Sequence, residues 1–367
     1  MENMGLCLDD RPDEGVFRVH RRVYTDPEIF ELEQKLIFER TWIFLTIDSQ
    51  IAKPGDFITT WIGKTPILVT RDAKGQVRAF SNVCRHKGAV LQRADKGNAK
   101  YHVCAYHGWA YDPAGKIVDV KEHDAGKYSQ AFDSANHDLE PLPNLASYNG
   151  IIFGSLSTEV EPLESYLGPE MCAHIKRVFH KPVVVLGYYH QVMQSNWKLY
   201  MENARDSYHA TILHAFYATF KLNRLTMGGG LVVNHHGWNT MNYSIGASLQ
   251  EGHYDPNELR AAMADVGLAE PALLNHRLEF ADGITVAIQS IFPTCVHQQI
   301  YNTLAMRQVV PLGPRKAELH WTFFGYADDD AQLRQLRLQQ ANLIGPAGYV
   351  SMEDGVIGEY VRSEEHT

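Results

Sequence analysis

The sequence has no apolar run long enough to cross a membrane. Its most apolar stretches, at 151–153 and 183–186, have the length of short strands, whereas a membrane-spanning helix needs about 20 apolar residues. Residues 1–15 are acidic and lack the apolar segment of a secretory signal. The sequence therefore predicts neither a membrane partner nor export.

Cysteine is scarce, and positive charge is outweighed by negative charge. The five cysteines are odd in number and widely spaced, which argues against a disulfide framework and favours a reducing compartment. We therefore expect a cytoplasmic protein.

The 34 Lys and Arg residues against 43 Asp and Glu residues give a formal net charge of −9. Without a basic run, no nucleic-acid partner is expected.

The 367 residues exceed what one hydrophobic core usually fills, so two domains are expected. Between 56 and 120, short β-branched or alternating runs are separated by Gly and Asp turns, which predicts a small all-β domain. Beyond 182, longer strand-like runs outnumber helices and rarely alternate with them. This pattern favours an antiparallel α+β domain.

Local signals predict individual elements. Asp26 and Pro27 open an expected helix over 28–44. The run of Asp328, Asp329 and Asp330 is interpreted as the N-terminal cap of a last helix. In the second domain we expect a polar helix at about 197–220 and strands at 183–194, 231–245, 284–292, 297–310 and 318–326.

Four of the metal-binding side chains form two mixed pairs, Cys84 with His86 and Cys104 with His107. A zinc finger usually groups its cysteines in one half and its histidines in the other, whereas each half here offers one thiolate and one imidazole. This set suits a [2Fe-2S] cluster in which one iron takes both sulfurs and the other both nitrogens. These are the ligands of a Rieske centre, which passes electrons to another site.

Two other interpretations of these pairs stay open at this point. A zinc-stabilised binding module would use the same residue types. A Rieske electron-transfer protein would carry the cluster without an oxygen-activating iron. Metal content distinguishes the three, because a Rieske cluster contains iron and sulfide, and only an oxygenase holds a further iron.

A second group of candidate ligands lies in the helix expected at 197–220. Asp206 and His209 fall on one helical face, but His209 and His214 are about 140° apart on a straight helix. If both bind one ion, the helix must break or bulge between them, as helices do at many functional sites. Two histidines and one carboxylate are the ligand set of mononuclear non-haem Fe(II) oxygenases.

The carboxylate ligand is expected near the end of the chain, where Glu353 and Asp354 lie in a glycine-rich, apolar segment. Spacing does not separate two adjacent carboxylates, so both are candidates. Arg224 and Arg307 could pair with a substrate carboxylate. Since a structural ion pair is the commoner role of a single arginine, we assign no substrate-binding residue.

With these motifs the chain resembles the large (α) subunit of the Rieske non-haem iron oxygenases that hydroxylate aromatic rings, from about residue 17 to residue 362. The pattern at 196–214 is most similar to the branch of salicylate 5-hydroxylase, terephthalate dioxygenase and anthranilate dioxygenase. The resemblance implies an α+β fold, with a Rieske all-β domain and a helix-grip-like antiparallel sheet domain. It also implies an oxidoreductase that hydroxylates an aromatic carboxylate, such as salicylate, anthranilate, benzoate or terephthalate, with O2.

The resemblance assigns roles to individual residues. The [2Fe-2S] ligands would be Cys84 and Cys104 on one iron and His86 and His107 on the other. The mononuclear iron ligands would be His209, His214 and Asp354, with Glu353 as the alternative to Asp354. Asp206 would bridge His209 to His107 of a neighbouring subunit and conduct electrons between the two centres.

The resemblance also implies partners. A head-to-tail homotrimer is expected, or an α3β3 assembly with a small β subunit. No Gly-x-Gly-x-x-Gly fingerprint is present. Electrons from NAD(P)H would therefore arrive through a separate flavin reductase and a ferredoxin.

The expected division of the chain is 1–40 for an N-terminal segment with its helix, 41–165 for the Rieske domain and 166–361 for a catalytic domain that is truncated. Residues 362–367 read Arg-Ser-Glu-Glu-His-Thr, the translation of a common sequencing adapter. We expect an artificial tail there, so His366 is not counted as a ligand.

Overall fold

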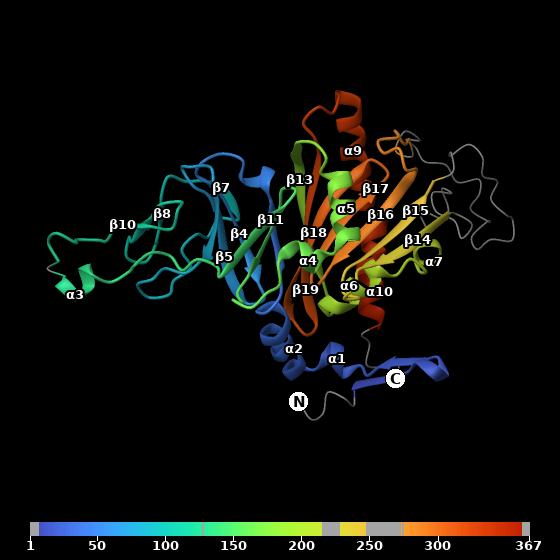
Figure 1. The fold of residues 1–367 in the computed structure, drawn as a ribbon, viewed down its shortest axis with the longest axis horizontal. Helices are drawn as coiled ribbons and strands as arrows, with labels where there is room; N and C mark the ends of the chain where they lie inside the picture. Colours follow the sequence, from blue (N-terminus) through green and yellow to red (C-terminus); the bar gives the residue numbers. More distant parts are fainter. Residues whose placement is uncertain (1–6, 127, 215–227, 247–272, 274, 362–367) are drawn as a thin grey trace. The chain divides into compact units, whose positions relative to one another are not determined.

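The computed structural model describes residues 7–126, 128–214, 228–246, 273 and 275–361, which leaves Arg224 and His366 outside the described residues. The chain divides into two compact units, one of residues 34–166 and one that combines 1–33 with 167–367 (Figure 1). The division predicted at 40, 165 and 361 stays a prediction. No helix within the described ranges has the length and apolar character needed to cross a membrane.

The 34–166 unit is built from antiparallel strands. Its four-stranded sheet has the order β6-β5-β4-β7, formed by Val77–Ser81, Thr65–Arg71, Asp56–Ile62 and Lys96–Asn98. One three-stranded sheet, β11-β12-β3, is formed by Asn144–Tyr148, Ile151–Ser155 and Ile43–Ile47. The other, β10-β9-β8, is formed by Ile117–Asp119, Ala110–Tyr111 and His102–Val103. The only helices of four or more residues described wholly inside this unit are the π turn Gln34–Phe38, the 3-10 turn Asp48–Ile51 and α3 (Gln130–Asp133).

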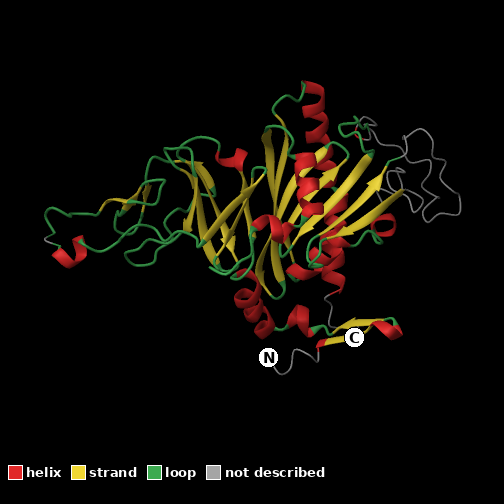
Figure 2. Cartoon of the chain, viewed as in Figure 1, coloured by secondary structure: helices red, strands yellow, loops and turns green. Residues whose placement is uncertain are grey.

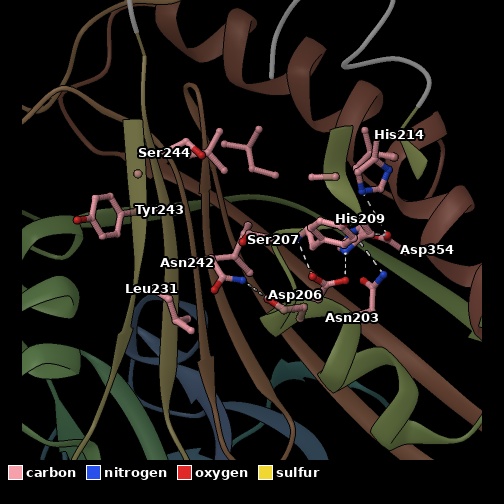
Figure 3. A pocket seen from close by; sticks show the side chains of 18 of the residues that line it. Asn203, Asp206, Ser207, His209, His214, Leu231, Asn242, Tyr243, Ser244 and Asp354 are labelled. Carbon is pink, nitrogen blue, oxygen red and sulfur yellow. Dashed lines mark hydrogen bonds and ion pairs between the residues drawn. The ribbon is translucent and has the colours of Figure 1, made fainter. Parts of the chain in front are cut away.

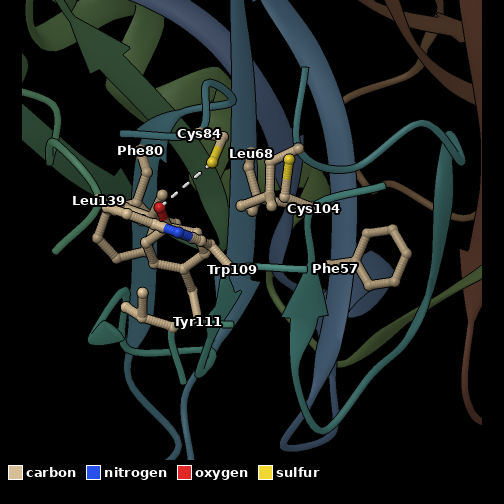
Figure 4. Packing of buried hydrophobic residues seen from close by; sticks show 10 residues of the cluster. Phe57, Leu68, Phe80, Cys84, Cys104, Trp109, Tyr111 and Leu139 are labelled. Atoms are coloured by element: carbon tan, nitrogen blue, oxygen red, sulfur yellow. Dashed lines mark hydrogen bonds between the residues drawn. The ribbon is translucent and has the colours of Figure 1, made fainter. Parts of the chain in front are cut away.

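The hydrophobic core of this unit contains side chains from both the strands and the loops that connect them. Phe57 and Leu68 come from neighbouring strands β4 and β5, and Trp109 and Tyr111 come from the segment around β9. Figure 4 shows these side chains packed around Cys84 and Cys104. The two candidate sulfur ligands therefore belong to the hydrophobic core, although they lie on loops.

The helix predicted over 28–44 is too long. Helix α2 (Pro27–Glu33) is followed by the π turn Gln34–Phe38, and Ile43–Ile47 forms strand β3. All five residues of β3 are buried, and the strand pairs with β12. Burial of this β-branched and aromatic run, paired with β12, therefore outweighs the helical periodicity seen in the sequence.

The second unit is organised around a large antiparallel sheet, whose strands are yellow in Figure 2. The sheet has seven strands in the order β13-β19-β18-β17-β16-β15-β14. Listed in chain order, its strands are Val183–Met193, Gly228–Val233, Thr240–Ile245, Ile284–Ile291, Cys295–Ile300, Thr303–Gly313 and Lys316–Tyr326. The predicted α+β class with an antiparallel sheet is confirmed.

Helices lie on both faces of this sheet. Helix α5 (Pro169–Val178) covers one face, where the Gln289 side chain donates to the Met171 carbonyl at 2.9 Å. Helices α6 (Trp197–Arg205), α9 (Ala331–Ile344) and α10 (Tyr349–Val361) lie on the other face. The remaining elements of the unit are β1 (Leu8–Arg11), β2 (Val16–Val19), α1 (Arg22–Thr25), α4 (Leu163–Leu167, at the boundary between the units) and α7 (Ala210–Leu213).

Two of the predicted strands are hairpins. The run at 231–245 turns at 234–239, so β14 and β15 pair with each other. The run at 297–310 turns at Tyr301 and Asn302, and Tyr301 adopts a positive φ of 52°. The sequence pattern did not indicate this turn because neither residue is glycine, although asparagine is a common turn residue.

Of the three aspartates predicted to cap the helix after 330, only Asp330 is the N-terminal cap in the structure. The Asp330 carboxylate accepts a hydrogen bond from the Leu333 amide at 2.8 Å and so caps α9. Asp329 instead forms an ion pair with the buried Arg337, at 2.7 Å from its Nε atom. Helix α10, which follows α9, was not predicted, and it carries both Glu353 and Asp354.

Candidate iron-binding sites

The loops 84–89 and 104–109 have the same backbone conformation. In each, the cysteine N–H donates to the carbonyl oxygen five residues later, at 2.8 Å in both loops. The glycine N–H then donates back to the cysteine carbonyl, at 3.0 and 2.9 Å. Gly88 and Gly108 have φ values of 72° and 78°, which glycine adopts without a steric penalty. The two halves of the motif are therefore a matched pair of turns.

These turns bring the four predicted cluster ligands together. The Cys84 and Cys104 side chains are buried, whereas His86 is exposed and His107 is half-buried. The two imidazole rings lie with their centroids 4.6 Å apart. The donor set therefore fits a [2Fe-2S] cluster whose sulfur-bound iron is inside the domain and whose imidazole-bound iron is near the surface.

Residues that the sequence did not single out support this group. The Tyr111 hydroxyl lies 3.5 Å from the Cys84 sulfur and accepts a hydrogen bond from the Arg85 amide at 3.1 Å (Figure 4). The Trp109 ring stacks on His86 at 4.9 Å between centroids. Trp109 is the last residue of the second loop and Tyr111 lies in β9, which follows it. Their contacts with the 84–89 loop hold the two loops against each other.

The second group forms where the helix predicted at 197–220 breaks. Helix α6 ends at Arg205, and Asp206 is its extended C-terminal cap, with φ −87° and ψ 113°. The chain turns at 206–209 before α7 begins, and the part of the predicted helix beyond 214 lies outside the described residues. The helix therefore breaks after Arg205, before His209. Residues 210–213, which separate the two histidines, form helix α7, so the break predicted between His209 and His214 is wrong.

Three of the predicted mononuclear ligands meet in the structure. The Oδ1 atom of Asp354 lies 3.6 Å from His209 Nε2 and 3.4 Å from His214 Nε2 (Figure 3). This oxygen is buried and has no hydrogen-bond partner among the described residues. One oxygen facing two imidazole nitrogens fits a shared metal ion, because an unpaired buried carboxylate oxygen is costly.

The other ring nitrogen of each histidine faces a different carboxylate. Asp206 Oδ2 lies 3.2 Å from His209 Nδ1, and Glu353 Oε2 lies 3.0 Å from His214 Nδ1. A carboxylate on Nδ1 fixes the ring so that Nε2 is available to a metal. Glu353 thus faces Nδ1 of His214, while Asp354 faces the Nε2 atoms of both His209 and His214. The partner expected on the far side of Asp206 belongs to a neighbouring subunit, so the electron bridge stays a prediction.

Burial sets the ionisation of this group. It lowers the pKa of His214 to about 3, assisted by the charges of His209 and Arg307. It raises the pKa of Asp354, opposed by His209, Arg307 and a hydrogen bond from Asn203. A neutral imidazole is the form that binds a metal ion, and a cation at this position would restore the charge of the carboxylate.

Sequence reasoning assigned no role to Asn203, although it stands one helical turn before Asp206. Its amide nitrogen lies 3.4 Å from His209 Nε2, and its side chain also hydrogen-bonds Asp354. The i, i+3 spacing of Asn203 and Asp206 on a polar helix was the signal that could have identified it.

A cavity of about 440 Å³ opens onto the three candidate ligands. Its lining also includes residues of the sheet, among them Asn242, Val286, Ile288 and Arg307. Arg307 is 6% exposed, donates from Nη1 to the Tyr200 hydroxyl at 2.7 Å, and lies 4.3 Å from the centre of the Trp321 ring. Among the described residues that line it, the cavity therefore combines apolar side chains such as Val286 and Ile288 with the buried cation of Arg307.

Comparison with known proteins agrees with this arrangement. Residues 41–146 match the family of the Rieske [2Fe-2S] domain, and residues 178–361 match the ring hydroxylating alpha subunit (catalytic domain). The chain belongs to the family of ring-hydroxylating oxygenase alpha subunits, so it is an oxidoreductase with a Rieske cluster and a non-haem iron. The predicted family is confirmed, and the match at 178–361 argues against an electron carrier or a zinc module.

Individual relatives are similar over most of their length. The chain is 42% identical to the terephthalate 1,2-dioxygenase terminal oxygenase component subunit alpha 2 of Comamonas sp, covering 94% of this chain and 85% of that protein. It is 39% identical to the anthranilate 1,2-dioxygenase large subunit of Burkholderia cepacia, covering 96% and 84%. The structure of naphthalene 1,2-dioxygenase from Rhodococcus sp. matches with a TM-score of 0.78 at 24% identity over 94% of this chain and 81% of that one, which supports the fold.

Proposed function

We propose that this α subunit hydroxylates the ring of a small aromatic carboxylate. The observation that carries the substrate class is Arg307, a buried cation in the wall of the cavity that reaches His209, His214 and Asp354. Within the described part of the chain, its hydrogen-bond partner is the Tyr200 hydroxyl and not a carboxylate. A desolvated guanidinium is stabilised by a bidentate carboxylate, which such a substrate would supply. The names of the two relatives above include aromatic carboxylates as substrates.

The proposed ligands follow from the geometry described above. The [2Fe-2S] cluster is assigned to Cys84, His86, Cys104 and His107, and the mononuclear iron to His209, His214 and Asp354. The bound iron would supply the activation of O2, with electrons relayed from NAD(P)H through reductase and ferredoxin. Asp206 and Glu353 then orient the two histidines, and Arg307 orients the substrate ring by holding its carboxylate.

The assembly proposed is a head-to-tail homotrimer, alone or with three β subunits. In one chain Asp206 lies beside His209 with its carboxylate 46% exposed. That exposure leaves an oxygen accessible to His107 of a neighbouring subunit. Closed cyclic contacts of this kind are common among homo-oligomers.

Product analysis tests the substrate class. The reconstituted enzyme, with reductase and ferredoxin, is supplied with salicylate, anthranilate, benzoate or terephthalate, and in parallel with benzamide and toluene. Hydroxylated products from one or more carboxylates, with oxygen consumption coupled to product, are expected. Turnover of the uncharged compounds with none of the carboxylates would contradict the proposal.

Arg307→Gln should raise the KM for the carboxylate substrate by at least about tenfold, because a charged hydrogen bond in a buried site contributes about 1.5–3 kcal/mol. The kcat/KM for an uncharged aromatic compound should change much less. Steady-state kinetics with both compounds provides the measurement. Tyr200→Phe is the matched control, since it removes the hydroxyl that holds Arg307 but leaves the cation. Equal losses for charged and uncharged compounds in Arg307→Gln would show a structural role.

Cys84→Ser and His107→Ala should each abolish the visible absorbance of the Rieske cluster and lower the iron content by about two atoms per chain. Each variant removes a donor from one of the two matched turns, and the remaining three do not complete the cluster. Iron and sulfide analysis together with the absorption spectrum provide the measurement. An unchanged spectrum in either variant would contradict the assignment.

A further inference from the structure

A third group of metal-binding side chains shares no residue with either candidate iron site. His190 stands on β13, and Glu318 and His320 stand on β19, its neighbour in the sheet. One ligand atom of each of the three residues lies within 4.8 Å of those of the other two. No role in the proposed reaction involves these residues.

Strand pairing explains why the three side chains converge. His190 is directly opposite His320 in the antiparallel pair, and Val192 is opposite Glu318. Residues two apart on a strand point to the same face, so both β19 side chains share a face with His190. The imidazole rings are stacked with centroids 4.0 Å apart, and His320 Nε2 lies 2.9 Å from a Glu318 oxygen.

The same register separates this group from the cavity. Trp321, which packs over Arg307 in the cavity wall, is next to His320 in the chain and so points to the opposite face of the sheet. His190 is exposed, and the side chains of His320 and Glu318 are 27% and 30% exposed. An ion from solvent can therefore reach the group without passing through the active-site cavity.

We propose that His190, Glu318 and His320 form a binding site for a divalent transition-metal ion, and that zinc is the ion that fits best. Two imidazoles and one carboxylate are a common zinc ligand set, and water completes the tetrahedral coordination. Imidazole donors disfavour magnesium and calcium, which prefer oxygen ligands. The rings now lie parallel, with 4° between their planes, so a shared ion requires the exposed His190 ring to turn about its Cβ–Cγ bond.

Binding of zinc chloride to the iron-loaded holoenzyme tests the site. Isothermal titration calorimetry should detect one zinc ion bound per chain. This binding should be lost in His190→Ala and in His320→Ala, and it should be weakened at least about tenfold in Glu318→Gln. X-ray absorption at the zinc edge should give nitrogen and oxygen ligands at about 2.0–2.2 Å. His20→Ala, which removes an exposed histidine elsewhere in the same unit, is the matched control and should retain the zinc ion.

The mononuclear iron site could also take up zinc, and one variant distinguishes the two. In His209→Ala the zinc ion assigned to His190, Glu318 and His320 should remain. Zinc uptake that persists in His320→Ala but disappears in His209→Ala would overturn the proposal. Absence of any zinc binding to the holoenzyme would overturn it as well, and neither result would affect the assignment of the oxygenase.

Discussion

Asp354→Asn is expected to empty the mononuclear iron site and to lower turnover by at least about 1000-fold, since bound iron contributes several kcal/mol to the reaction. The amide carries no charge, and Asp354 Oδ1 is the atom that faces both His209 Nε2 and His214 Nε2. Iron content measured beside the absorbance of the Rieske cluster provides the test. The cluster should be unaffected because its ligands belong to the other compact unit.

Glu353→Gln is the matched control for that result. The Gln oxygen can still accept a hydrogen bond from His214 Nδ1, so we expect the variant to retain iron with affinity reduced by about tenfold or less. If Glu353→Gln empties the site and Asp354→Asn does not, the two carboxylates have been assigned in the wrong order. Loss of the cluster together with the iron in Asp354→Asn would indicate unfolding and would invalidate that variant as a probe of the ligand.

Asp206→Asn is expected to retain both metal centres and to lower turnover by at least about 100-fold. A carboxylate accepts N–H bonds from two imidazoles, whereas a neutral amide offers one acceptor oxygen. The substitution is conservative for the backbone, because asparagine can still accept the Tyr208 amide hydrogen bond that Asp206 Oδ1 accepts at 2.6 Å. The turn between α6 and α7 should therefore persist.

Single-turnover kinetics isolates the effect of Asp206. A pre-reduced enzyme is mixed with substrate and O2, and the recovery of the oxidised cluster spectrum is followed. Slow recovery at full iron occupancy, in a trimer that still assembles, is the expected result. Recovery at the wild-type rate would refute the relay, leaving Asp206 as the cap of α6 and the support of His209.

The two turns that carry the proposed Rieske ligands were predictable because their geometry is local. Each half of the motif is a six-residue turn that combines a cysteine, a histidine and a glycine with positive φ. The antiparallel domain was also predictable, since long strand runs without intervening helices allow few other folds. The helical angle between His209 and His214 predicted a break between them, but the residues that separate them form helix α7 and the break lies before His209.

The prediction for residues 28–44 shows the limit of local patterns. The periodicity of Phe30 and Leu36 suggested one amphipathic helix, but Leu36 is 45% exposed, while all of Ile43–Ile47 is buried in a strand that pairs with β12. Whether a short apolar run becomes helix or strand depends on which distant segment covers it. Sequence periodicity does not contain that information.

The sequence by itself determined the donor types, their spacing in the matched turns, and the pairing of Asp206 with His209. Only the tertiary structure distinguished Asp354 from Glu353, because adjacent residues on α10 point about 100° apart and the packing of that helix decides which one faces both histidines. Packing likewise placed Arg307 in the cavity wall, more than 90 residues from His214. Contacts between distant segments depend on burial and register, and these arise only when the whole sheet has formed.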